Sequence, residues 1–193
     1  MKYTEDFYNL SHGTDVESAR DICLNGFEIR GDATSWCGKG VYFYDMKSKA
    51  WWAANRKCEE IKQQKQIKVE PIIILSDIIN IYKDDIFDLR AKNDLEQFET
   101  FVKEVLSEGA ELKVSGITDD TERKILLRSM LISFYADKIK CKLVIGNFRQ
   151  RPQPLYEHSI EFANSLDMIF GIETIYCVKD VSIISNVRLG GNR

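Results

Sequence analysis

Apolar and polar residues alternate along several stretches of the chain in patterns that predict β-strands. Aromatic and β-branched residues with a period of two are typical of half-buried strands. The stretch from Val69 to Tyr82 is instead dominated by Ile and Val, as expected of a central strand buried on both faces. We predict strands over 7–10, 41–44, 69–82, 143–145, 173–178 and 181–189, with further apolar stretches at 156–162 and 168–171.

The first helix is predicted from Asp15, its expected N-cap, to Cys23. Apolar residues at helical spacing face one side of this segment. Asn25-Gly26 ends it, because both residues tolerate the left-handed conformation found at many helix ends.

A second helix follows the aromatic strand and runs to about Lys65, with Asp45 or Ser48 as its expected cap. The stretch 84–140 then shows two amphipathic patterns separated at Gly109, which predicts a helical insertion. Together these patterns predict an α+β fold. We interpret residues 1–193 as a single domain, because this length suits one domain that carries an insertion.

The composition is that of a soluble globular protein, with 44% hydrophobic and 30% charged residues. A net charge of −3 gives no overall basic field toward nucleic acid or anionic lipid, so a nucleic-acid target would need a local patch. The five cysteines are scattered singly without metal-ligand spacing, so we expect reduced thiols and no metal. The sequence shows no signal peptide and no membrane-spanning stretch, so we expect a cytoplasmic protein unless a dedicated secretion system exports it.

The densest chemical signal lies in residues 36–56, where a glycine-flanked turn precedes the strand 41–44. Gly38 and Gly40 allow the backbone to bend sharply or to lie against a ligand. Tyr42 would then meet a ligand lying across the strand. Upstream, the small polar cluster Ser11-His12-Gly13-Thr14 closes a short strand and forms the second part of the signal.

These residues resemble the catalytic core of the poly(ADP-ribose) polymerases. The resemblance is carried by His12-Gly13-Thr14, by the segment 38–49 (Gly-Lys-Gly-Val-Tyr-Phe, then Asp-Met and Ser-Lys) and by Glu173. It covers roughly residues 8–82 and 142–190. It implies the split antiparallel β-sheet of the diphtheria-toxin-like ADP-ribosyltransferases, which carry a His-Tyr-Glu triad and use NAD as substrate without a metal.

The resemblance also implies a role for each matching residue. His12 would bond the adenosine-side ribose, the Gly13 backbone the nicotinamide carboxamide, and Tyr42 would stack on the nicotinamide ring. Glu173 would hold the ribose 2′-hydroxyl and polarise the acceptor. The expected catalytic residues are therefore Glu173, His12 and Tyr42, and the expected cofactor-binding residues are His12, Gly13, Thr14, Gly40, Tyr42 and Trp52.

Several positions depart from the family pattern. Ala50 stands where a serine usually helps to hold the carboxamide, and Ala53 stands where a second stacking aromatic is expected. Trp51 or Trp52 would have to supply that aromatic surface from a neighbouring position. Glu28 takes the place of a basic residue, with Arg30 two positions further on.

The third member of the triad stays open between Glu173 and two other carboxylates, Glu157 and Glu161. Gly171 lies two residues before Glu173, at a position where arginine- and asparagine-modifying toxins carry Glu or Gln. This argues against that subclass. The segment from about Arg149 to Phe170 would face the acceptor.

The resemblance predicts mono-ADP-ribosylation of a protein or nucleic-acid acceptor, in a toxin or phage-defence effector. An antitoxin or immunity protein is then a partner to consider, and no membrane partner is expected. Two alternatives remain: an NAD glycohydrolase with water as acceptor, and a non-catalytic module that binds NAD or ADP-ribose.

Overall fold

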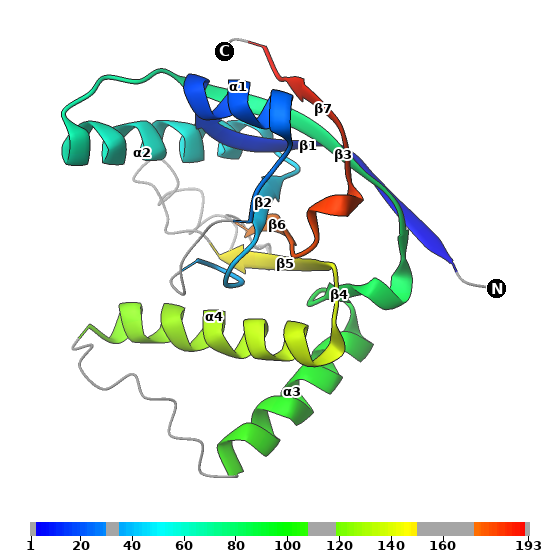
Figure 1. Ribbon diagram of the computed structural model, residues 1–193. Helices are drawn as coiled ribbons and strands as arrows, with labels where there is room; N and C mark the ends of the chain where they lie inside the picture. The colour runs from blue at the N-terminus through cyan, green and yellow to red at the C-terminus, as the bar shows by residue number, and fades with distance from the viewer. Residues whose placement is uncertain (1–2, 30–34, 108–118, 150–171, 192–193) are drawn as a thin grey trace, which may run out of the picture.

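The computed structural model describes residues 3–29, 35–107, 119–149 and 172–191, which fold as an α+β protein around one sheet (Figure 1). Seven strands form this sheet in the order β4-β5-β6-β2-β1-β3-β7. Neighbouring strands are antiparallel except β4 and β5, which are parallel. In chain order the elements are β1 (Thr4–Asp15), α1 (Val16–Asn25), β2 (Val41–Tyr44), α2 (Lys47–Lys65), β3 (Pro71–Tyr82), β4 (Ile86–Asp88), α3 (Lys92–Ser107), α4 (Asp120–Ile139), β5 (Leu143–Arg149), β6 (Ile172–Val178) and β7 (Ile184–Leu189).

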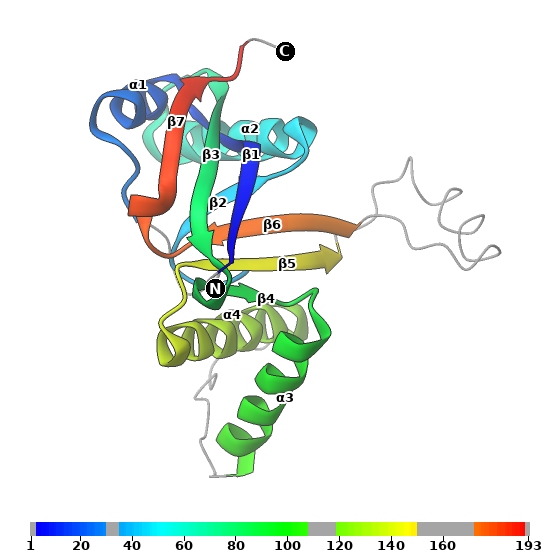
Figure 2. The ribbon, with the colours of Figure 1, turned by 90° about the vertical axis from the view of Figure 1, so that its right-hand side faces the viewer.

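The sheet parts between β1 and β2. Strand β1 pairs with β3 along its length, from Thr4↔Tyr82 to Asp15↔Pro71, whereas it registers with β2 only at Ser11↔Tyr44. Figure 2 shows the result: β1, β3 and β7 run together, and β5 and β6 run across them. Two groups of strands are therefore joined at a narrow point.

Each face of the sheet carries its own hydrophobic cluster, because successive side chains of a strand point to opposite faces. On β2, Phe43 belongs to one cluster and Tyr44 to the other. The Phe43 cluster receives Ala19 of α1, and the Tyr44 cluster receives Ala50 of α2 together with side chains of α3 and α4. Helix α1 thus covers one face, and α2, α3 and α4 cover the other.

The start of α1 confirms the predicted cap. Asp15 accepts a hydrogen bond from the Ser18 backbone N–H at 2.9 Å, and Gly26 ends the helix at φ +84°, where a side chain would be strained. The predicted cap of α2 is wrong. The N-cap is Met46, which makes no side-chain cap bond, because the chain stays extended for one residue beyond Asp45 and Ser48 already lies inside the first turn.

The stretch 84–140 differs from the prediction at its beginning. It opens with a short 3₁₀ turn and strand β4, whose Ile86 and Phe87 are buried, before α3 begins. Three residues are too few to show a period, so the sequence pattern gives no sign of this strand. The predicted strand at 181–189 likewise begins with a 3₁₀ turn, and β7 starts at Ile184. Gly109 and the stretches 156–162 and 168–171 lie outside the described residues.

None of the helices in the described part of the chain is long and apolar enough to cross a membrane.

Helix α2 approaches β1 so closely that position 13 has no room for a side chain. A Cβ on Gly13 would collide with the carbonyl oxygen of Ala50 and lie 2.7 Å from the backbone nitrogen of Ala54. Both contacts are with helix backbone, which cannot rotate away. The glycine is therefore required by packing, whatever else its backbone does.

We expect Gly13→Ala to destabilise the protein by about 2–3 kcal/mol, because overpacking must displace α2 from the sheet. The free energy of unfolding in urea measures this cost. Ser48→Ala, at an exposed position of α2, is the matched control and should change stability by less than about 0.5 kcal/mol. A Gly13→Ala protein as stable as this control would contradict the packing argument.

Candidate functional site

The three residues expected from sequence to act together lie on three neighbouring strands. Glu173 is on β6, Tyr42 on β2 and His12 on β1, and these strands are consecutive in the sheet. The sequence separates them by 30 and 131 positions. The fold therefore brings three distant segments to one region, next to the point where the sheet parts.

The His12 side chain joins β1 to β2 where the strand pairing ends. Its Nδ1 lies 2.8 Å from the carbonyl oxygen of Tyr42. The imidazole packs against Phe27 and Phe43, with ring centroids 5.2 and 5.8 Å away. A side-chain hydrogen bond thus takes over beyond Ser11↔Tyr44, where backbone pairing stops.

This contact fixes the protonation state of the ring. A carbonyl only accepts, so Nδ1 must carry the proton and donate it to Tyr42. Burial lowers the pKa of His12 to about 4 and the charge of Lys57 lowers it further, while the bond to Tyr42 acts in the opposite direction. At neutral pH the ring is uncharged, and Nε2 is left as a hydrogen-bond acceptor.

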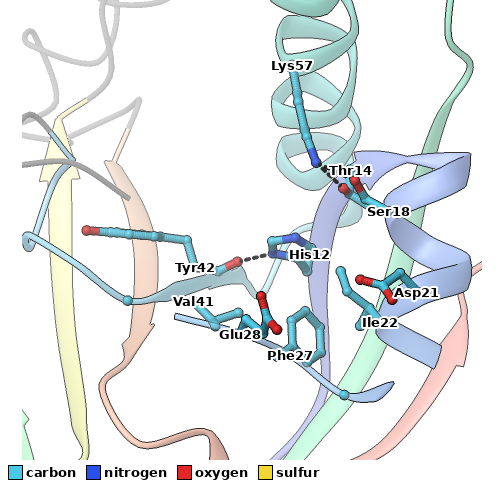
Figure 3. Close-up of a pocket in the computed structure, with 12 residues that line it drawn as sticks. His12, Thr14, Ser18, Asp21, Ile22, Phe27, Glu28, Val41, Tyr42 and Lys57 are labelled. Carbon is cyan, nitrogen blue, oxygen red and sulfur yellow. Dashed lines mark hydrogen bonds between the residues drawn. The ribbon is translucent and has the colours of Figure 1, made fainter. Parts of the chain in front are cut away.

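A pocket of about 190 Å³ adjoins this ring. Figure 3 shows His12 between β2 on one side and the side chains of Thr14, Ser18 and Lys57 on the other. Of the six expected cofactor-binding residues, four line the pocket and two do not. The pocket is lined by His12, Thr14, Ser18, Asp21, Ile22, Gly26, Phe27, Glu28, Gly40, Val41, Tyr42 and Lys57.

The two exceptions, Gly13 and Trp52, have other surroundings. Gly13 faces α2, as described above. Trp52 is 42% exposed and lies under the guanidinium of Arg56, 5.6 Å from the ring centroid. Trp51 is half-buried and packs against the same core cluster as Tyr42. The orientation of α2 therefore makes Trp51, and not Trp52, the neighbour of the tyrosine.

Lys57 ties the floor of the pocket together. Its ammonium donates to Thr14 Oγ1 at 2.7 Å and to Ser18 Oγ at 3.0 Å, and it pairs with Asp15 Oδ2 at 2.8 Å. Burial alone would raise the pKa of Asp15, but the bonds from Lys57 and Ser18 hold it well below its usual range. The carboxylate stays ionised and keeps both the ion pair and the helix cap.

The Tyr42 ring lies on the face opposite His12. Its hydroxyl donates to the Gly38 carbonyl and accepts from the Cys37 backbone N–H at 2.9 Å, so the ring closes the glycine turn on itself. Burial raises the pKa of Tyr42 far above its usual value. The phenol is therefore a neutral group with a fixed orientation.

Glu173 shares the face of Tyr42. Cys177 of β6 is directly opposite Tyr42, and Glu173 lies on the same face of β6 because residues 173, 175 and 177 alternate with the others. The carboxylate is buried, with 4% of its side chain exposed, and forms an ion pair with Lys49 at the start of α2. Burial lowers the pKa of Lys49.

Three cations near the site were not assigned a role from sequence. Lys49 belongs to the Ser-Lys motif that carried the resemblance, so that motif was the available signal. Lys57 falls in a charge-rich helix that looks like a solvated face. Arg128 of α4 lies over Trp36, 4.4 Å from the ring centroid, and Trp36 packs on Phe148, the cross-strand neighbour of Glu173. Nothing in the sequence links α4 to this face.

Some candidates cannot be placed. Glu157, Glu161 and Arg30 lie outside the described residues, so the choice among the three carboxylates stays a prediction. Within the described ranges, no group of three or more His, Cys, Asp or Glu side chains is arranged to hold a metal ion. Comparison of the chain with protein-family models, with curated proteins and with solved structures finds no match.

The low pKa of His12 predicts a loss of stability in weak acid. Between its ordinary value of 6.5 and about 4, the unfolded chain binds a proton that the folded protein does not. The associated stability is complete above pH 6.5 and is lost as the pH falls through this interval. Between pH 7 and pH 5 the wild type should lose on the order of 2 kcal/mol more than His12→Gln.

Urea unfolding of both proteins at the two pH values measures the difference. The remaining titratable groups are common to both proteins and cancel in the comparison. Equal losses in wild type and His12→Gln would show that the imidazole is not held neutral by burial.

Proposed function

We propose that this protein is an NAD-dependent ADP-ribosyltransferase, which cleaves the bond between nicotinamide and ribose and transfers ADP-ribose to an acceptor. The observation that carries the proposal is the position of His12, Tyr42 and Glu173 on the consecutive strands β1, β2 and β6. A sheet that parts beside these residues agrees with the split sheet that the resemblance implies. We therefore propose the ADP-ribosyltransferase fold as well.

The reaction needs groups of the kind found here. When the C–N bond to nicotinamide breaks, its electron pair leaves with the nicotinamide and positive charge develops on the ribose. A carboxylate close to the ribose stabilises this charge, and fixed hydrogen-bonding groups orient the substrate. Glu173 would supply the carboxylate and would take the proton that the acceptor loses when it adds to the ribose.

The His12 pocket would receive the adenosine-side ribose. A neutral imidazole with a bare Nε2 accepts a hydrogen bond from a hydroxyl, which is what a ribose offers. Tyr42 and Trp51 would bound the nicotinamide side. No residue assigned here calls for a metal. Mono-ADP-ribosylation of a protein or nucleic acid remains the form of the reaction that we propose.

A second candidate is a module that binds NAD or ADP-ribose without turnover. Two observations favour it. Ala50 is fully buried and offers no hydroxyl to a carboxamide, and Glu173 is already neutralised by Lys49. Catalysis by Glu173 would require the Lys49 ammonium to move or to share the carboxylate with the substrate.

Nicotinamide release from NAD by the purified protein tests the proposal. Glu173→Gln keeps the size of the side chain and removes its charge, so we expect release to fall about 10²–10³-fold. Glu59→Gln is the matched control, because Glu59 is exposed on α2 away from the pocket, and should leave the rate unchanged. Circular dichroism verifies that both variants are folded.

Labelled NAD with a cell lysate then distinguishes the outcomes. Label in protein or nucleic acid supports transfer, and free ADP-ribose alone indicates a glycohydrolase. NAD binding without release from any of the three proteins would favour the binding module. Equal release by wild type and Glu173→Gln would exclude Glu173 as the catalytic carboxylate.

We further propose that the enzyme acts as a toxin or phage-defence effector, for which an antitoxin or immunity protein would be the partner. Depletion of NAD or modification of an essential molecule would slow growth. We expect expression of the wild type, and not of Glu173→Gln at equal protein levels, to arrest growth. Equal growth of the two strains would contradict this role.

A further inference from the structure

The pocket beside His12 carries carboxylates on its wall. Asp21 comes from α1 and Glu28 from the segment after it, and both line the pocket. Figure 3 shows the two side chains on the same side of the pocket as Phe27 and Ile22. Asp21 Oδ1 accepts from the Asn25 amide at 2.6 Å, which leaves its second oxygen available.

The positive charge in the pocket is already engaged. Lys57 is the cation among the described lining residues, and an ammonium group has three N–H donors. Its three printed partners, Thr14, Ser18 and Asp15, match that number. The Asp15 carboxylate also neutralises its charge. The pocket therefore offers acceptors and a net negative wall, and not a cationic one.

Such a wall suits a sugar with free hydroxyls. In dinucleotide-binding proteins a carboxylate accepts from the ribose 2′-hydroxyl of NAD, whereas an arginine accommodates the 2′-phosphate of NADP. The neutral Nε2 of His12 is a further acceptor for a hydroxyl. A phosphate at the same place would bring about two negative charges against the carboxylates and would have no free donor from Lys57.

We propose that Asp21 and Glu28 are specificity-determining residues, which make this pocket select a nucleotide ribose with free 2′- and 3′-hydroxyls and exclude its 2′-phosphorylated form. This inference rests on the proposed function for the identity of the ligand, since it takes the His12 pocket as the site of the adenosine-side ribose. It adds the discrimination and the residues responsible for it.

Isothermal titration with ADP-ribose and with 2′-phospho-ADP-ribose tests the inference without requiring turnover. We expect the wild type to bind the 2′-phosphorylated ligand at least about tenfold more weakly, because like charges at close range repel. Asp21→Asn with Glu28→Gln should reduce that ratio to about threefold or less. Because screening weakens charge repulsion, the wild-type ratio should also fall as salt is raised.

Glu17→Gln is the matched control, an exposed carboxylate one turn before Asp21 on α1 that does not line the pocket. It should keep the wild-type ratio. Equal affinity of the wild type for both ligands, or an unchanged ratio in the double variant, would overturn the inference while nicotinamide release could still support the enzyme. Binding of neither ligand would overturn the inference together with the use of this pocket for NAD.

Discussion

The hydrogen bond from His12 to the carbonyl of Tyr42 lies where the two groups of strands separate, and the geometry of the site depends on it. Beyond Ser11↔Tyr44 the backbone of β2 has no partner on β1. The imidazole supplies one across the opening. One contact therefore fixes the position of β2, the tautomer of the ring and the availability of Nε2. An alternative side chain at position 12 would have to meet all three requirements.

The two rings linked through this bond face opposite sides of the sheet. His12 packs with Phe43, and the Tyr42 ring packs with the cluster that contains Ile175 and Cys177. A molecule that contacts both rings must follow the edge of β2 where that strand is unpaired. The separation of the strands thus creates a passage between two environments, one with carboxylates and a neutral imidazole and one with aromatic rings and the Lys49–Glu173 pair.

Local patterns predicted the elements that local chemistry determines. The aromatic run gave β2 at 41–44, and Asp15 and Gly26 gave the ends of α1. Strand β4 was missed because its formation depends on pairing with β5, which is far away in sequence. The partners of Lys57 were missed for the same reason, since Thr14 lies 43 positions away. Whether Trp51 or Trp52 neighbours Tyr42 depended on the rotation of α2, which the sequence leaves undetermined.

Helix α2 also sets a length. Lys49 and Lys57 are eight residues apart on it, which corresponds to about 12 Å along a helix axis. One lysine pairs with Glu173 on β6 and the other with Asp15 at the start of α1. Because a helix does not stretch, these two buried carboxylates stand at a constant separation, like two marks on a ruler. Small ligands can occupy one end, and only a molecule of roughly dinucleotide dimensions can reach both.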